Sequence, residues 1–251
     1  MATASIPIAP GLRLRHLVRR WFFPAMALAM IATSLAGFVP SMAHPLGRHA
    51  PVSGLVAAHG IVFFAWLLLF LVQSGLVATG YKRLHRNLGL ASLSILALMI
   101  PLGYGVTIAM VRRGFDLSGD LHVAGDAAYE AVFPLSNLLI FSVLAIAAVA
   151  YRRRPELHKR LMLFANIELM PAPLTHLIGH TPSLTSLPGA IVIVPISMFV
   201  LAAVGRDLLD QGRVHRLTWG LAALRIVSGP LEAGPIGTSS AWHHLVSWLA
   251  P

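Results

Sequence analysis

Long apolar runs separated by short polar connections dominate the pattern of this chain. A membrane-spanning helix needs about 20 mostly apolar residues, because each residue rises about 1.5 Å through a hydrocarbon core about 30 Å thick. Seven runs fit this description: Trp21–Pro40, Gly54–Gly80, Leu88–Val111, Val132–Tyr151, Leu161–Leu177, Leu187–Val204 and Val214–Leu231. The pattern therefore predicts an all-α, polytopic transmembrane bundle of seven helices that forms one domain over residues 1–251.

The two ends of this pattern are its least regular parts. The first run begins after Arg19-Arg20 and resembles a secretory signal, but its length and the incomplete twin-arginine motif favour a retained helix. The seventh run contains Arg225 and is either a short span or an interfacial helix. Residues 239–249 predict a short interfacial helix, with one apolar face made of Trp242, Leu245, Val246 and Leu249.

Composition supports a membrane protein and excludes several other classes. Hydrophobic residues make up 57% of the chain and charged residues 11%, whereas soluble domains have about 45–50% and about 25%. The mean hydropathy is +0.76. Because the chain has no cysteine, disulfides, zinc fingers, thiol proteases and iron–sulfur centres are excluded.

The net charge of +10 is explained by where the basic residues lie. With a cytoplasmic N-terminus, 15 Lys and Arg residues fall on the inner side of the predicted spans, and three, Arg48, Arg112 and Arg113, fall on the outer side. Cytoplasmic connections of membrane proteins are rich in Lys and Arg. We therefore expect the N-terminus inside, the C-terminus outside, and membrane lipids rather than nucleic acid as partners of the surplus charge.

Short polar motifs interrupt the apolar pattern. They include His59-Gly60, Trp66-Leu67-Leu68-Leu69-Phe70 with Gln73, Leu84-His85-Arg86 with Leu88-Gly89, Arg152-Arg153-Arg154-Pro155-Glu156, and His158-Lys159-Arg160-Leu161-Met162. Together they resemble an uncharacterised family of bacterial inner-membrane proteins with about seven spans, catalogued as hypothetical. The resemblance covers most of the chain. It implies a multi-pass helical fold in the bacterial inner (plasma) membrane, and it implies no catalytic or binding residue.

Two ionisable residues are predicted at a depth where a charge is costly. Glu168 lies eight residues beyond Arg160, and Arg225 lies nine residues beyond Arg216. A rise of about 1.5 Å per residue places both roughly 12–13.5 Å above the inner boundary. An isolated charge there costs a few kcal/mol, so we expect a buried ion pair between the fifth and seventh helices, with Asn166 as a further partner.

The role of this pair stays open at the level of sequence. Pro171 and Pro173 follow Glu168 closely, so the fifth helix is predicted to kink and to leave backbone carbonyls free for a cation or water. The pair fits a structural link that fixes how the helices pack. The second interpretation is a proton or ion relay that uses the same residues.

Histidines form a second candidate group near the outer surface. His59 and His176 are expected at similar depth on the second and fifth helices, where two imidazoles could ligate a b-type haem. His176 and His180 have the spacing for a shared divalent metal, and the facing loop carries Asp120, His122, Asp126 and Glu130. Solvated or hydrogen-bonded histidines explain the same pattern without a cofactor. Gly60, next to His59, is expected to allow close approach of another helix or a ligand.

These observations leave three functions. The first is a non-enzymatic membrane protein that binds or moves a small solute or proton through an interior built around Glu168 and Arg225. The second is a redox protein that binds haem b through His59 and His176. The third is a metal-dependent membrane hydrolase that uses His176 and His180. The sequence identifies neither the small-molecule ligand nor the oligomeric state, and it is compatible with a homo-oligomer.

Overall fold

A computed structural model of the chain describes residues 10–43, 52–114, 126–179 and 192–251. Helices account for 89% of these residues, and no strand occurs among them. Five helical segments are long and apolar enough to cross a membrane: Arg15–Pro40, Gly54–Thr79, Lys82–Arg113, Ala127–Ala150 and Pro155–Gly179. The structure is therefore that of a multi-pass helical membrane protein.

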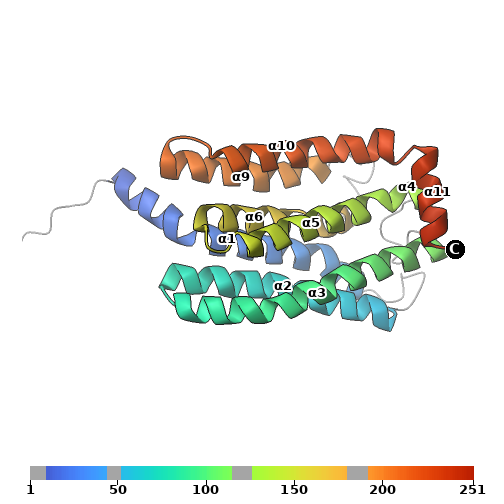
Figure 1. Cartoon of the computed structure of the whole chain (residues 1–251), viewed down its shortest axis with the longest axis horizontal. Coiled ribbons are helices and arrows are strands. Elements are labelled where there is room, and N and C mark those ends of the chain that lie inside the picture. The colour runs from blue at the N-terminus through green and yellow to red at the C-terminus, as the bar shows by residue number, and fades with distance from the viewer. Residues whose placement is uncertain (1–9, 44–51, 115–125, 180–191) are drawn as a thin grey trace, which may run out of the picture.

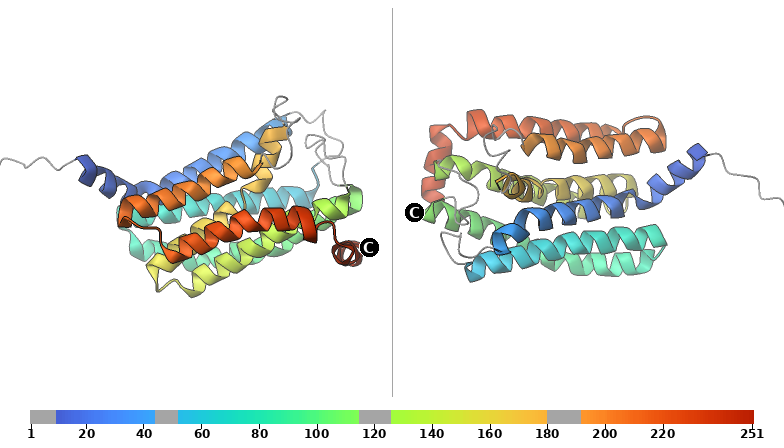
Figure 2. Two further views of the ribbon diagram at one scale, coloured as in Figure 1. Left: turned by 90° about the horizontal axis from the view of Figure 1, so that it is seen from above. Right: turned by 180° about the vertical axis from the view of Figure 1, so that it is seen from behind.

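The helices form an elongated bundle of three layers (Figure 1). One layer is the hairpin of α2 (Gly54–Thr79) and α3 (Lys82–Arg113), and the opposite layer is the hairpin of α9 (Ile193–Gln211) and α10 (Arg216–Leu231). Between them lie α1, α5, α6 and α7, which span Pro10–Ala43, Val132–Ala150, Pro155–Ile167 and Pro171–Gly179. The right-hand view in Figure 2 shows the same order of layers.

Three tight turns lie at one end of the bundle, which we call the turn end (Figure 1). Gly80 and Gly212 end α2 and α9 with φ of 92° and 68°, a conformation that glycine adopts without steric cost. The third turn, residues 151–154, joins α5 to α6. All three turns carry arginine or lysine, so the described basic residues concentrate at this end.

The other end, which we call the α11 end, is crossed by a short helix. The chain continues from α10 through η3 (Glu232–Ile236), a π-helical turn, into α11 (Ser240–Leu249), which lies across the bundle axis. Trp242 Nε1 donates to the carbonyl oxygen of Ala128 in α4 (Ala127–Glu130) at 2.7 Å, and His243 Nε2 lies 2.5 Å from Asp126 Oδ2. These contacts dock α11 onto the start of the α4–α5 segment.

The core consists of apolar side chains from all three layers. Its largest fully buried apolar members are Met30, Met99, Phe141, Phe164, Ile167 and Met170. At Gly37, an added Cβ would lie 2.2 Å from the carbonyl oxygen of Pro173, so this glycine lets α1 and α7 touch. Gly60 has no heavy atom within 4 Å of the equivalent position, so the expected close approach of another helix is wrong for the described part of the chain.

The fifth predicted span is broken rather than merely kinked. Residues 168–170 are not helical, and they separate α6 from α7. Pro171 explains the break, because proline has no N–H to donate and disfavours a helical conformation in the preceding residue. By length and composition the two helices together form one candidate span, Pro155–Gly179, although α7 turns away from the direction of α6 (Figure 2).

The sixth and seventh predicted spans are not among the five candidates. Residues 187–191 of Leu187–Val204 lie outside the described part of the chain, and α9 extends beyond Val204 to Gln211, with three charged residues in its last turns. The helix α10 has 16 residues, which gives it a length of about 24 Å. The first four predicted spans correspond to helices of similar or greater length, such as Trp21–Pro40 within α1 and Leu88–Val111 within α3.

Candidate functional site

The break between α6 and α7 places a carboxylate in the interior of the bundle. Glu168 is the first residue after α6, and its side chain is 1% exposed. Its backbone N–H still donates to the carbonyl oxygen of Phe164 at 3.1 Å, whereas Leu169 and Met170 close tighter turns onto Asn166 and Ile167. The end of α6 therefore fixes where Glu168 lies, and the break separates it from α7.

Arg225 connects this carboxylate to two other helices. Its Nη1 donates to Glu168 Oε2 at 2.8 Å and to Asn137 Oδ1 of α5 at 3.1 Å. The Arg225 side chain is 8% exposed, so the contact is closed to bulk solvent. The structure thus brings Glu168 and Arg225 together and adds Asn137 as a third member.

The polar partner expected at this position was a different asparagine. Asn166 Nδ2 donates to the carbonyl oxygen of Met162 at 2.8 Å, within its own helix, and its Oδ1 is buried without a hydrogen-bond partner in the described structure. Asn137 was not singled out from the sequence. It is an uncharged amide within the apolar run Val132–Tyr151, so the positions of charged residues do not reveal it.

A second carboxylate, Glu232, lies close enough to the same arginine for their charges to interact. It lies in η3, seven residues beyond Arg225, and is 3% exposed. Its Oε1 has no hydrogen-bond partner in the described part of the chain, and the charges of Arg225 and Glu168 both act on it. We call Asn137, Glu168, Arg225 and Glu232 the buried charged site. It contains one guanidinium and two carboxylates, and π-helical turns such as η3 are frequent at functional positions.

Another group of charges is buried at the turn end. Arg160 Nη2 donates to Asp207 Oδ1 at 2.6 Å, and Arg160 Nε donates to Thr218 Oγ1 at 3.0 Å. The side chains of Arg160 and Asp207 are only 3% and 2% exposed. Arg160 was counted from the sequence as a charge in a connection between helices, but it lies inside the bundle.

Two further acidic and basic residues extend this group. Arg206 Nη1 lies 2.9 Å from Asp207 Oδ1, and Arg206 Nη2 lies 3.1 Å from Asp210 Oδ2. Arg19 Nε lies 2.8 Å from Asp210 Oδ1, as an ion pair without the alignment of a hydrogen bond. We call Arg160, Arg206, Asp207, Asp210 and Thr218 the turn-end cluster. This cluster joins α6, α9 and α10, and it contacts α1 through Arg19. Because the charges of α9 are paired within it, α9 can pack inside the bundle.

One face of α10 connects the two groups. Thr218, Arg225 and Glu232 follow one another at intervals of seven residues, and all three are buried. Seven residues are about two helical turns, or roughly 10.5 Å, so these side chains lie on one face. Buried Leu221 and Ala222 lie between Thr218 and Arg225, so the polar stripe has an apolar gap.

The candidate haem ligands His59 and His176 each lie against a different aromatic ring. The ring of His59 stacks on Phe63 with centroids 4.0 Å apart, and the ring of His176 lies 4.9 Å from that of Phe38. His180 lies outside the described residues. Within the described ranges there is no group of three or more His, Asp or Glu residues able to hold a metal. The haem and metal hypotheses therefore stay predictions without support from these contacts.

The buried charged site is the arrangement with the clearest chemical consequence. Its two carboxylates cannot both be neutralised by one guanidinium, and no second basic residue pairs with them in the described ranges, so a proton or another cation is needed to supply the missing charge. No family model, curated protein or solved structure matches this chain.

Proposed function

We propose that this chain is a seven-helix protein of a bacterial-type inner membrane that binds a proton in a polar interior and moves it through the bilayer. The observation that carries the proposal is that two buried carboxylates, Glu168 and Glu232, both lie within reach of the charge of one arginine, Arg225. An uncompensated charge in a membrane interior costs a few kcal/mol or more, so the second carboxylate is stable there only when it is neutralised.

Glu232 is the carboxylate that takes the proton. Glu168 is already paired with Arg225 at 2.8 Å, whereas Glu232 Oε1 has no partner among the described residues. Protonation removes the charge of Glu232. It leaves one guanidinium and one carboxylate, which form a neutral pair.

The polar stripe on α10 supports a route for the proton. It begins at Thr218, which accepts from Arg160 and donates to Asp207 in the turn-end cluster, and it continues through Arg225 to Glu232 near the α11 end. The gap at Leu221 and Ala222 spans about 10.5 Å between Thr218 and Arg225, so transfer there requires water or a movement of α10.

Seven spans with a cytoplasmic N-terminus agree with the arrangement of the helices. The helix α9 has 19 residues, or about 28 Å, and its buried charges are paired within the turn-end cluster. The helix α10 continues into η3, and together they approach the thickness of a bilayer. The concentration of basic residues at the turn end favours that end as the cytoplasmic one.

Proton binding is tested by infrared spectroscopy of the purified protein in lipid. At neutral pH we expect the carbonyl band of a protonated, buried carboxylic acid, and we expect Glu232→Gln to remove it. Asp126→Asn is the matched control, because Asp126 is an exposed carboxylate whose replacement leaves the band unchanged. The absence of this band in the unaltered protein would contradict proton binding.

Proton movement is tested in vesicles that contain a pH-sensitive dye. With a potassium diffusion potential across the membrane, the unaltered protein should acidify the vesicles faster than protein-free vesicles do. Glu232→Gln should reduce the rate to that of the empty vesicles, whereas Asp126→Asn should keep it. If the unaltered protein gives the rate of empty vesicles, the site binds a proton without moving it, and this part of the proposal is wrong.

A further inference from the structure

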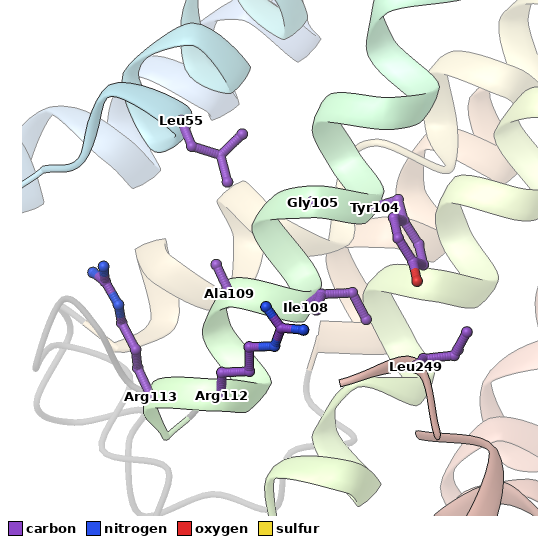
Figure 3. A pocket seen from close by; sticks show the side chains of 8 residues that line it. All are labelled: Leu55, Tyr104, Gly105, Ile108, Ala109, Arg112, Arg113 and Leu249. Carbon is purple, nitrogen blue, oxygen red and sulfur yellow. The ribbon is translucent and has the colours of Figure 1, made fainter. Parts of the chain in front are cut away.

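A pocket opens at the α11 end, away from the buried charged site. Its volume is about 520 Å³, within the range of small-molecule sites. It lies between the start of α2, the last turns of α3 and the end of α11, and its lining includes Leu55, Tyr104, Ile108, Arg112, Arg113 and Leu249 (Figure 3). The pocket therefore combines an apolar wall with two cationic side chains.

The two arginines point back along α3 toward the apolar wall. Side chains of a helix tilt toward its N-terminus, so residues four apart are neighbours. Figure 3 shows Arg112 reaching toward Ile108, and Arg113 extending past Ala109 on the side of Leu55. Neither guanidinium forms an ion pair within the described part of the chain. Basic residues in the last turn also complement the helix dipole, but that effect explains neither the apolar hollow nor its lining.

The chemistry of the lining identifies the class of ligand. Guanidinium groups bind phosphate through paired, charge-assisted hydrogen bonds. Leu55, Ile108 and Leu249 present hydrocarbon beside them. A ligand that satisfies both features has an anionic phosphate and an apolar chain.

The position of the pocket identifies where that ligand comes from. The neighbouring helix α11 exposes Trp248 and Leu245, with 73% and 45% of their surface accessible. Exposed indole and leucine side chains on a short helix at the end of a membrane bundle are typical of the lipid interface. The pocket thus opens where phospholipid headgroups meet their acyl chains.

We propose that this pocket binds an anionic phospholipid of the leaflet at the α11 end. Its phosphate lies against Arg112 and Arg113, and an acyl chain lies along Leu55, Ile108 and Leu249. This site is separate from the buried charged site, so the proposal is independent of proton movement.

The test is a calorimetric titration of the full-length protein in a neutral detergent with dihexanoyl phosphatidylglycerol. We expect the replacement of both arginines, Arg112→Gln with Arg113→Gln, to weaken binding at least about tenfold, because charge-assisted hydrogen bonds are lost. The matched control is Arg152→Gln with Arg153→Gln at the turn end, which removes the same charge and should change the affinity less than about twofold.

Two further titrations distinguish the lipid from other ligands. Dihexanoyl phosphatidylcholine should bind at least about tenfold more weakly than the anionic lipid, and inorganic phosphate should not compete at equal concentration. Ala109→Phe fills the apolar side of the pocket, keeps both arginines and should also weaken binding. Equal binding of the two lipids, equal binding of free phosphate, or unchanged affinity in either pocket variant would overturn the proposal.

Discussion

Arg225 Nη1 lies 2.8 Å from Glu168 Oε2, and this contact joins α10 to the break between α6 and α7. Glu168 is almost fully buried and Arg225 nearly so, which makes each the main compensation for the charge of the other. Loss of one partner of a buried ion pair leaves an uncompensated charge and costs roughly 3–5 kcal/mol. The stability of the bundle should therefore depend on both residues.

The first prediction concerns single and double replacements of this pair. Arg225→Gln should lower the free energy of unfolding by roughly 3–5 kcal/mol, because it leaves the buried carboxylate of Glu168 without its cation. Glu168→Gln should cost less, since the charge of Arg225 can still interact with Glu232 after that carboxyl loses its proton. Denaturant unfolding in detergent measures both values.

The double variant separates a structural pair from a relay. Glu168→Gln with Arg225→Gln should recover much of the stability lost in Arg225→Gln, because neither position then holds a buried charge without its partner. Recovery of stability with loss of proton uptake indicates a relay, whereas recovery of both indicates a structural link. Single variants as stable as the unaltered protein would show that the contact contributes nothing.

The second prediction concerns the turn-end cluster. Asp207→Asn should lower the free energy of unfolding by roughly 3–5 kcal/mol, because Arg160 and Arg206 both lose the buried carboxylate to which they donate. The matched control is Glu156→Gln, which also removes a carboxylate that contacts Arg160. The side chain of Glu156 is 53% exposed, so the control should cost less than about 1 kcal/mol. Equal effects of the two variants would contradict a special role for the buried contact.

The depth of the charged residues could be predicted from the sequence, but their partners could not. A helix rises uniformly, so counting from Arg160 and Arg216 is enough to put Glu168 and Arg225 at one level. Asp207 is 47 residues from Arg160, and no local pattern pairs them. Glu232 follows directly after the last residue of the predicted seventh span, and its burial depends on η3 packing against α5, which is a tertiary effect.

The number of spans shows a similar limit. The first five predicted spans each correspond to one of the five long apolar segments. In α9 the charges of Arg206, Asp207 and Asp210 lower the hydropathy, although packing against α6 and α10 neutralises them. The mean hydropathy of a sequence segment includes these charges but contains no information about the residues that pair with them.

The third prediction concerns the docking of α11 and its dependence on pH. Hydrogen bonds to the Ser239 carbonyl oxygen and to Asp126 raise the pKa of His243, and the contact with His243 lowers the pKa of Asp126. A histidine with a raised pKa stabilises the folded state below its unfolded value of about 6.5, and this contribution is lost as the pH rises through the folded pKa. The lowered pKa of Asp126 gives stability above about pH 3.9, which is lost as the pH falls.

This docking is measured with a spin label, because the chain has no cysteine and Ser247→Cys provides one attachment point on exposed α11. The label should be least mobile between about pH 4 and pH 6.5 and more mobile at higher pH. His243→Gln should remove this dependence while the Trp242 contact to Ala128 remains. A label whose mobility does not change with pH in the unaltered background would refute the prediction.

The fourth prediction concerns Gly37, where α1 touches α7. Gly37→Ala would place its Cβ 2.2 Å from the backbone carbonyl oxygen of Pro173, which cannot move without shifting α7. We expect a loss of roughly 1–3 kcal/mol, as for other overpacked contacts. Gly60→Ala is the matched control, because its Cβ meets open space and alanine favours a helix by up to about 1 kcal/mol. Thermal unfolding in one detergent compares the two, and equal stability would show that α1 and α7 are not in close contact.

The fifth prediction concerns the direction of the helices in the membrane. Single cysteines are introduced into the cysteine-free chain at exposed positions. The positions at the turn end are Arg83, Arg153 and Arg213, and those at the α11 end are Arg113 and Ser247. A membrane-impermeant maleimide is then added to intact cells. The seven-span arrangement with a cytoplasmic N-terminus predicts labelling at Arg113→Cys and Ser247→Cys and protection at the three turn-end positions until the cells are opened.

Arg213→Cys is the decisive variant because it lies in the turn between α9 and α10. If these two helices cross the bilayer, this turn lies on the same side as Arg83 and Arg153 and is protected with them. If only the five longer segments cross, the chain leaves α7 on the outer side, and Arg213→Cys reacts in intact cells. That result would place Arg225 and Glu232 outside the membrane interior, and it would remove the cost of an unpaired carboxylate on which proton binding depends.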